Sequence, residues 1–219
     1  MVRLTLRALS VLAAVFGVLS FICLVVAIST DYWYIIDTSG LVNKSSLAQS
    51  SHSGLWRVCY YEKQCLSLVN PFRSTENYTD SVRQLLHMQG TFSVLLPLSV
   101  IIMVVGGMLG FMGLLARAYL LLMMTAVLLL LGSLISLTGA SVYVAYSAVA
   151  FRELMCMLDP KSLEGLRILF GWSLTLAWIS SASELITSIA FLLACRVITQ
   201  QREPHSLSRE SLATFTCKE

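Results

Sequence analysis

The sequence predicts an all-α membrane protein in which four transmembrane helices form a bundle and one outer loop carries a small β-structure. Three observations lead to this fold class: the composition, four long apolar stretches, and a loop rich in β-branched and aromatic residues between the first two stretches. Of the 219 residues, 57% are hydrophobic and 12% are charged, and the mean hydropathy is +0.77. Soluble domains are about 45–50% apolar and about 25% charged. The composition therefore excludes an ordinary soluble domain.

The charge balance argues against a nucleic-acid-binding protein. The 15 basic and 12 acidic residues leave a net charge of +3, and the basic residues are spread along the chain. Binding to a phosphate backbone requires a basic patch or stripe. We therefore expect no nucleic-acid partner, and we expect membrane lipids around the apolar segments.

Four segments are long and apolar enough to cross a bilayer. A helix needs about 20 consecutive apolar residues to span a hydrocarbon core of roughly 30 Å. The segments that reach this length are residues 8–28, 91–115, 119–144 and 170–197. They should be helical because the bilayer core holds no water to pair with free backbone groups. Pro97, in the second segment, is expected to bend that helix rather than end it.

The remaining segments are loops and tails. Residues 116–118 form so short a connection that the second and third spans should make a tight antiparallel hairpin. The other parts outside the membrane are the N-terminus, the two long loops and the C-terminal tail, which comprise residues 1–7, 29–90, 145–169 and 198–219.

Basic residues close to the spans predict which side faces the cytosol. The basic residues at both termini and in the short turn all fall on one side: Arg3, Arg7, Arg117, Arg196 and Arg202. The two long loops on the other side contain eight basic residues, but eight acidic residues accompany them. We therefore expect a plasma-membrane protein with both termini in the cytosol and both long loops outside the cell.

Two chemical features of the first long loop agree with this orientation. Asn43 and Asn77 each begin an Asn-X-Ser/Thr acceptor for N-glycosylation, a modification made in the secretory lumen. Cys59 and Cys65 lie in the same loop, where an oxidising compartment permits a disulfide. Both features predict a glycoprotein whose first loop faces the exterior.

The first apolar segment has a second interpretation as a cleavable signal peptide. Arg3 and Arg7 resemble the basic start of such a peptide, and residues 27–29 resemble a small-residue cleavage site. The apolar core of a signal peptide is usually about 7–15 residues long. Residues 8–28 exceed that length, which favours an uncleaved signal-anchor helix.

A β-hairpin is predicted in the first long loop. Residues 55–61 and 64–69 are rich in β-branched and aromatic side chains, and the Glu-Lys pair between them marks a reversal. Cys59 and Cys65 would then face each other across the hairpin. A disulfide there would close a short ring and stabilise the loop by about 2 kcal/mol. The alternative is two free surface thiols.

A tryptophan, a Gly-Leu-Trp-Arg string and two cysteines form a pattern between the first two spans. The residues are Trp33, Gly54, Leu55, Trp56, Arg57, Cys59 and Cys65. Taken alone, Trp33 is also typical of an interfacial aromatic anchor. The whole pattern resembles the W–GLW–C–C signature of the claudin/PMP-22/EMP/MP20 superfamily, which includes the gamma subunits of voltage-gated calcium channels. Four spans with cytosolic ends are similar to that superfamily as well.

The resemblance implies a left-handed four-helix bundle with a small extracellular antiparallel sheet, to which the second loop adds a strand. It also implies that Trp33 and Trp56 seat the sheet on the bundle, because their rings bury a large area while the indole N–H finds a polar partner. Two features differ from claudins: the cysteines are closer together, and the tail ends in Thr-Cys-Lys-Glu rather than in the PDZ-binding Tyr-Val. The Phe-Gly-Trp-Ser string at 170–173 favours the gamma-like branch.

Several residues inside the spans are candidates for contacts within the membrane. Ser180, Glu184 and Ser188 fall four residues apart and share one face of the fourth helix. A charged side chain at mid-bilayer costs about 2.5–3.5 kcal/mol on insertion scales. We therefore expect Glu184 to face inward as a neutral acid that is hydrogen-bonded to a hydroxyl or a backbone carbonyl. The alternatives are a contact for a partner helix and a proton site.

Small and sulfur-containing residues add two further predictions. Gly106 and Gly110 form a G-x-x-x-G pattern that favours close helix packing within the bundle, with a dimer surface as the alternative. Cys195, at the cytosolic end of the fourth span, is a candidate for S-palmitoylation, with a buried inert thiol as the alternative.

Two functional classes are compatible with the sequence. A zinc-binding histidine pair, a nucleotide loop and a nucleophile elbow are all absent from it, so we expect neither an enzyme nor a cofactor. The first class organises membrane or cell–cell contacts, at apical or lateral surfaces, by binding copies of itself or family members through the outer sheet. The second class is an auxiliary, gamma-like subunit that modulates a voltage-gated calcium channel or another ion channel.

Overall fold

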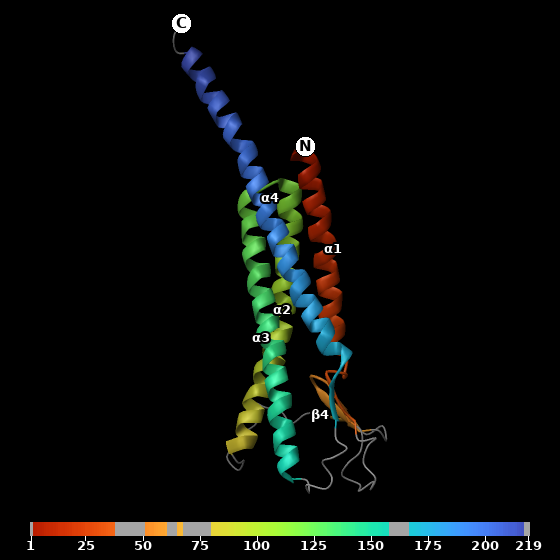
Figure 1. Cartoon of the computed structure of the whole chain (residues 1–219). Coiled ribbons are helices and arrows are strands. Elements are labelled where there is room, and N and C mark those ends of the chain that lie inside the picture. Colours follow the sequence, from red (N-terminus) through yellow and green to blue (C-terminus); the bar gives the residue numbers. More distant parts are fainter. Residues whose placement is uncertain (1, 38–50, 61–64, 68–79, 158–166, 217–219) are drawn as a thin grey trace.

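The computed structural model shows a bundle of long helices with a small sheet at one end (Figure 1). It describes residues 2–37, 51–60, 65–67, 80–157 and 167–216. The helices in this part of the chain are α1 (Val2–Ser29), α2 (Asp80–Ala116), α3 (Tyr119–Met157) and α4 (Trp172–Thr216). Each of these four helices is long and apolar enough to cross a membrane, which confirms the predicted fold class.

The predicted spans lie within these helices, with one difference at the start of the fourth. Phe170 belongs to a strand rather than to α4, because it pairs with Tyr34 across the sheet. The helices also continue past the predicted spans: α2 already begins at Asp80, and α3 ends only at Met157. Backbone hydrogen bonds inside a helix do not depend on lipid, so polar residues outside the apolar stretch extend it.

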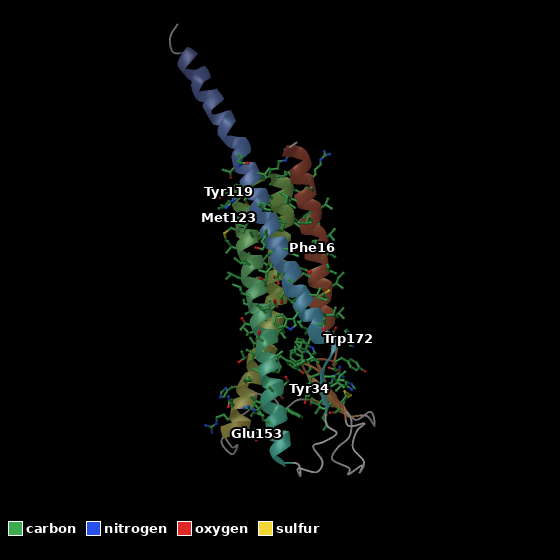
Figure 2. All side chains as sticks on the ribbon, viewed as in Figure 1. Phe16, Tyr34, Tyr119, Met123, Glu153 and Trp172 are labelled. Carbon is green, nitrogen blue, oxygen red and sulfur yellow. A yellow bond between two sulfur atoms is a disulfide. The ribbon has the colours of Figure 1, made fainter. Side chains whose placement is uncertain are left out.

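The helices pack in a ring in which the contact between α1 and α2 is the smallest. α2 packs along α3, α3 along α4, and α4 along α1, whereas α1 and α2 touch over only a short stretch. The N-terminus of α1 and the α2–α3 turn lie at the end of the bundle opposite the sheet, and α4 extends beyond the bundle at that same end (Figure 1). Figure 2 shows Tyr119 and Met123 near this end and Trp172 and Tyr34 near the sheet.

The turn between α2 and α3 is as tight as its sequence predicts. Arg117 has a φ of 50°, in the left-handed region that commonly ends a helix. The backbone N–H of Ala118 donates to the carbonyl of Gly113 at 3.2 Å, and the N–H of Leu122 donates to the carbonyl of Ala118 at 3.2 Å. With these bonds, α2 ends at Ala116 and α3 begins at Tyr119.

The sheet is antiparallel throughout and joins both long loops. Its strands are β1 (Tyr34–Asp37), β2 (Ser51–Ser53), β3 (Arg57–Tyr60), β4 (Cys65–Ser67) and β5 (Arg167–Phe170). They run in the order β4-β3-β2-β1-β5, so β5 from the second long loop pairs with β1. This arrangement confirms the small antiparallel sheet and the extra strand that the family resemblance implies.

Glycines let the helices approach inside the bundle. A Cβ at Gly106 would stand 3.2 Å from Leu129, and one at Gly110 would stand 2.8 Å from Phe191 and 2.9 Å from Thr125. Both glycines therefore face other helices of the same chain, which supports packing within the bundle over a dimer surface.

Candidate functional site: the tryptophan-anchored sheet

Trp33 fixes the sheet to the bundle. Its side chain is fully buried, and its indole Nε1–H donates to the carbonyl of Ala27 at 2.8 Å, at the end of α1. The backbone N–H of Trp33 donates to the carbonyl of Ser53 at 3.0 Å, next to the start of β1. One residue thus bonds both the helix and the sheet. The alternative of an interfacial aromatic anchor is wrong, because an anchor of that kind would have its ring exposed at the membrane surface.

An aromatic cluster from α2 and α3 receives the Trp33 ring. Tyr143 is fully buried, and its ring centroid lies 4.7 Å from that of Trp33 and 5.1 Å from that of Phe92. The Tyr143 hydroxyl donates to the carbonyl of Ser53 at 3.4 Å, which ties α3 directly to β2. Sequence reasoning missed Tyr143 and Phe92. Both lie in long apolar spans, where the hydrophobic pattern does not show which residues contact Trp33.

The turn before β3 requires a glycine. A Cβ at Gly54 would stand 2.5 Å from the Cα of Asp31, closer than atoms can approach. The N–H of Gly54 donates to the carbonyl of Arg57 at 2.8 Å and closes the turn. Leu55 is buried beneath this turn. Gly54 and Leu55 therefore allow this turn to pack closely against the segment that follows α1.

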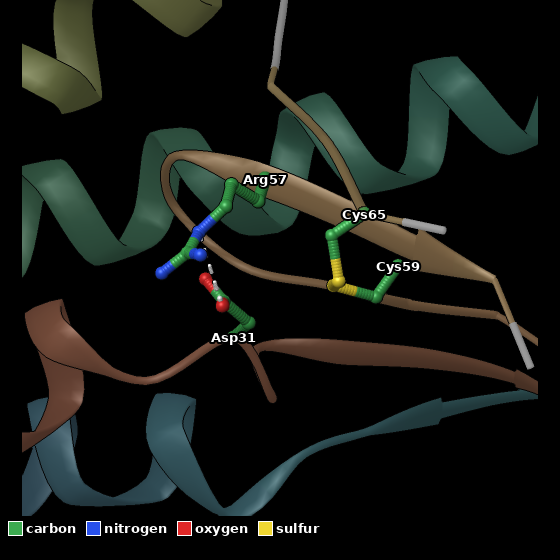
Figure 3. Close-up of a disulfide and its surroundings, with 4 residues drawn as sticks. All are labelled: Asp31, Arg57, Cys59 and Cys65. Carbon is green, nitrogen blue, oxygen red and sulfur yellow. Dashed lines mark ion pairs between the residues drawn. A yellow bond between two sulfur atoms is a disulfide. The ribbon is translucent and has the colours of Figure 1, made fainter. Parts of the chain in front are cut away.

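Trp56 and Arg57 lie on the outside of the same turn. The indole Nε1–H of Trp56 donates to the carbonyl of Ile28 at 3.1 Å, although 44% of the side chain is exposed. Arg57 forms an ion pair with Asp31 at 3.5 Å (Figure 3). Exposed ion pairs contribute about 0–1 kcal/mol. The two motif tryptophans therefore bond successive carbonyls at the end of α1, but only Trp33 is buried.

The predicted disulfide is present between β3 and β4. Cys59 and Cys65 are direct partners in the antiparallel register, with their Cα atoms 4.0 Å apart, and the bond joins them (Figure 3). This confirms the hairpin and rejects the alternative of two free thiols. β3 begins at Arg57, two residues later than predicted, because Leu55 and Trp56 form the turn before it, and residues 61, 64, 68 and 69 of the predicted hairpin lie outside the described residues.

A second close approach joins α4 to the start of the sheet. A Cβ at Gly171 would overlap the carbonyl oxygen of Tyr32. The N–H of Gly171 donates to the carbonyl of Trp33 at 2.9 Å, and the N–H of Ser173 donates to the carbonyl of Tyr32 at 3.2 Å. The Thr30 and Ser173 hydroxyls are 2.9 Å apart. The Phe-Gly-Trp-Ser string therefore closes the junction between α1, β1 and α4.

An exposed aromatic rim surrounds this junction. The ring of Tyr32 stacks on His52 with centroids 4.5 Å apart and lies 6.0 Å from the ring of Trp172. Tyr32 and Trp172 are exposed, and so is Trp56 on the neighbouring turn. Aromatic residues with one polar group are enriched where membrane and water meet. The residue types of the rim are therefore typical of a membrane–water boundary.

Inside the bundle, the polar face of α4 is buried as predicted. Ser180 bonds reciprocally with Ser20 of α1, at 2.9 and 2.8 Å, and the Ser188 hydroxyl donates to the carbonyl of Ala126 at 2.8 Å. Glu184 is also buried, so the prediction of an inward-facing acid is consistent with the structure. Its expected hydroxyl or carbonyl partner is not found, because neither carboxyl oxygen has a hydrogen-bond partner among the described residues.

Two other predicted sites have different outcomes. Cys195 is buried, with its sulfur 3.9 Å from the carbonyl oxygen of Tyr119, an environment that favours the inert thiol over palmitoylation. The acceptor residues Asn43 and Asn77 lie outside the described residues, and glycosylation there stays a prediction.

Comparison with known proteins agrees with this architecture. The family model for "PMP-22/EMP/MP20/Claudin tight junction" matches residues 18–193, from α1 to α4. A four-helix membrane bundle capped by a disulfide-bonded sheet defines the class, and the chain belongs to the PMP-22/EMP/MP20/Claudin family.

Individual relatives match over a shorter stretch. The human voltage-dependent calcium channel gamma-5 subunit is 44% identical over 57 residues, and the human gamma-7 subunit is 34% identical over 58 residues. The mouse gamma-5 subunit is 42% identical over 57 residues. Each match covers 25% of this chain and 21% of the relative, so the chain aligns with about a fifth of the length of these proteins.

Proposed function

We propose that the protein is a non-enzymatic plasma-membrane glycoprotein that organises membrane or cell–cell contacts through its sheet, which faces outside the cell. The observation that carries this proposal is the rigid attachment of the sheet. Trp33 is buried between α1, the sheet and the aromatic cluster, and Gly171 ties α4 to the same point. A platform held at several points loses little conformational entropy when it binds a partner.

The outer strands offer apolar side chains to a partner. Leu66 of β4 and Leu169 of β5 are 60% and 52% exposed, and these strands form the two edges of the described sheet. A sheet edge has unpaired backbone groups that another strand can join. Apolar residues on such edges support binding to a second copy of the protein or to a family member.

The distribution of basic residues supports an external sheet. Arg7 at the start of α1 and Arg117 in the α2–α3 turn belong to the end opposite the sheet, as Figure 1 shows for these elements. Basic residues close to spans favour the cytosolic side. An external sheet also agrees with its disulfide, because such bonds form in oxidising compartments.

A second candidate is an auxiliary subunit of an ion channel. The specific observation that favours it is the similarity to gamma-5 and gamma-7 subunits of voltage-dependent calcium channels. This similarity covers only about a fifth of each relative. In this role the protein would bind a channel in the same membrane rather than a partner on a facing cell.

A mixed-cell experiment separates the two roles. Cells that express the full chain with a fluorescent tag would be mixed with cells that lack it and with cells that carry a second colour. We expect enrichment at contacts between two expressing cells and a loss of enrichment for Leu66→Lys, which adds a charge to the exposed β4 strand. Gln84→Lys, exposed on α2, is the matched control and should behave like the wild type.

Three other outcomes would decide against the contact-forming role. Equal enrichment at contacts with non-expressing cells, or no effect of Leu66→Lys, would contradict adhesion through the sheet. Recovery of a channel subunit at stoichiometric yield, after affinity purification in mild detergent and mass spectrometry, would favour the auxiliary role.

A further inference from the structure

A cavity of about 390 Å³ lies between α1, α2 and α4, where α1 and α2 make the smallest contact of the ring. Its lining includes Val18 of α1 and Phe111 of α2, which are 59% and 68% exposed, so the cavity opens at the outer surface of the bundle. A Cβ at Gly107, also in the lining, would meet no heavy atom within 4 Å, so α2 leaves room here. In a bundle that crosses a membrane, this outer surface faces lipid.

The walls of this cavity offer no hydrogen bond to a ligand. The hydroxyls of Ser20 and Thr187 already donate to backbone carbonyls of α4, at 2.9 and 2.8 Å. Both carboxyl oxygens of Glu184 are buried, and one of them lies against Gly132 of α3. The other lining residues are apolar or glycine. A polar group brought into such a space would lose its water without gaining a partner, so the part of a ligand that enters must be hydrocarbon.

The dimensions of the cavity select a single chain. Along α2 the lining runs from Met103 to Leu114, which at about 1.5 Å per residue is about 16 Å, close to half of a hydrocarbon core of roughly 30 Å. Over this length the volume corresponds to a mean cross-section of about 24 Å². A helix about 10–12 Å across has a cross-section of roughly 80–110 Å² and does not fit. Carbon atoms in contact lie about 4 Å apart, so the cavity has room for one hydrocarbon chain from one leaflet.

The position of the cavity shows which leaflet would supply the chain. Leu114 lies two residues before the end of α2, at the end of the bundle opposite the sheet (Figure 1). Arg7 is exposed and precedes the lining residue Ala14 by seven residues, or about two turns, so both lie on one face of α1. Residues 1–30 and 81–152 contain no acidic residue. A basic residue near the membrane surface attracts anionic lipid headgroups, and no acid of α1 or of the α2–α3 turn opposes this attraction.

We propose that this cavity binds one acyl chain of an anionic phospholipid from the leaflet at the end opposite the sheet, with the headgroup beside Arg7. The chain lies along the apolar walls and supplies the dispersion contacts that α1 and α2 do not make with each other. The second chain of the same lipid stays in the bilayer. Lipid binding here is independent of either role proposed above, because it uses the lipid-facing side of the bundle and not the sheet.

The test uses the purified full-length protein in phosphatidylcholine nanodiscs and a phosphatidylglycerol probe with a photoreactive diazirine in one acyl chain. We expect saturable labelling of the peptides of α1 and α2 that line the cavity. Unlabelled phosphatidylglycerol should compete about fivefold better than phosphatidylcholine with the same chains, which is the effect of one arginine near an anionic headgroup.

Four variants locate the chain and the headgroup. Gly107→Leu should abolish the saturable labelling by filling the cavity, and it should fold because its Cβ meets open space. Met108→Leu, at a neighbouring position that is 65% exposed and outside the lining, is its matched control and should label normally. Arg7→Gln should remove the preference for phosphatidylglycerol while a phosphatidylcholine probe still labels the cavity. Arg83→Gln removes the same charge from an exposed position at the sheet end of α2 and should keep the preference.

The other outcomes would overturn the assignment. Labelling that does not saturate, or that is unchanged in Gly107→Leu, would mean that the probe stays in the surrounding lipid and does not enter the cavity. Equal competition by the two phospholipids would exclude an anionic headgroup at Arg7. Stronger competition by a sterol than by either phospholipid would identify a fused-ring body as the occupant. Loss of a dimer in Gly107→Leu by native mass spectrometry, with unchanged labelling, would identify a second copy of the chain.

Discussion

Replacing Trp33 by alanine tests how the sheet is held on the bundle. The side chain is fully buried, its Nε1–H donates to the carbonyl of Ala27 at 2.8 Å, and its ring contacts Tyr143. Truncating a buried tryptophan to alanine typically costs about 3–5 kcal/mol. The substitution also removes the donor to the Ala27 carbonyl, and a hydrogen bond contributes about 1 kcal/mol. We therefore expect a loss near the upper end of that range, which is a large fraction of the stability of a typical domain.

Two companion variants divide this loss into its parts. Trp33→Phe keeps most of the apolar ring but removes the indole donor, so it should lose less than Trp33→Ala. Trp56→Ala removes a tryptophan that also bonds a helix-end carbonyl but is 44% exposed, and should cost about 1–2 kcal/mol. The order of stability should be wild type, then Trp33→Phe and Trp56→Ala, with Trp33→Ala lowest.

The assay is equilibrium unfolding of the purified protein in mixed micelles of a mild detergent and SDS, followed by near-ultraviolet circular dichroism. The aromatic cluster around Tyr143 and Phe92 would report loss of the sheet junction. A Trp33→Ala variant that is no less stable than Trp56→Ala would refute the reasoning, because burial would then not determine the contribution of each tryptophan.

Substitutions at three further places test other contacts of the described residues. Cys59→Ser, Cys65→Ser and the double variant should each lose about 2 kcal/mol in the same assay, since all three remove the same ring closure; an additive double variant would contradict a shared bond. Gly171→Ala should lower stability by about 1–3 kcal/mol, because its Cβ overlaps a backbone carbonyl, and unchanged thermal stability would count against that close approach. Gly132→Ala should be destabilising because its Cβ meets a Glu184 oxygen, and the effect should shrink in a Glu184→Ala background; an equal effect in both backgrounds would show that the two residues are not coupled.

The helices could be predicted from sequence because a bilayer imposes a simple requirement. A long uncharged apolar stretch must satisfy its backbone groups internally, so residues 91–115 and 119–144 had few alternatives to a helix. The ends were harder to predict. Helices α2 and α3 continue into polar sequence, where hydropathy no longer marks the boundary.

The Cys59–Cys65 hairpin was also predictable, because its pairing depends on residues that are neighbours in sequence. The pairing of β1 with β5 joins distant segments, and no local pattern specifies that register. The same limit applies to Tyr143, which lies in an apolar span and receives Trp33 only in the folded chain. Gly171 could not be explained from sequence either, since its role depends on the position of the Tyr32 carbonyl.

The missing partner of Glu184 has a different physical cause. Sequence spacing placed Ser180 and Ser188 on the same face of α4 as the acid, whose expected partner was a hydroxyl or a backbone carbonyl. Both are bonded elsewhere: Ser180 to Ser20, and Ser188 to a backbone carbonyl of α3. Spacing on one helix shows which residues share a face, but neighbouring helices determine which hydrogen bonds remain available.

The orientation of the sheet is tested most directly by mapping glycans and protease access on intact cells that express the full chain with a cytosolic C-terminal tag. We predict that Asn43→Gln and Asn77→Gln each increase gel mobility by one glycan, and that an extracellular protease cuts the chain near the sheet while the tag stays protected. Neither asparagine glycosylated, together with a sheet that only a cytosolic protease can reach, would contradict an external, tryptophan-anchored platform.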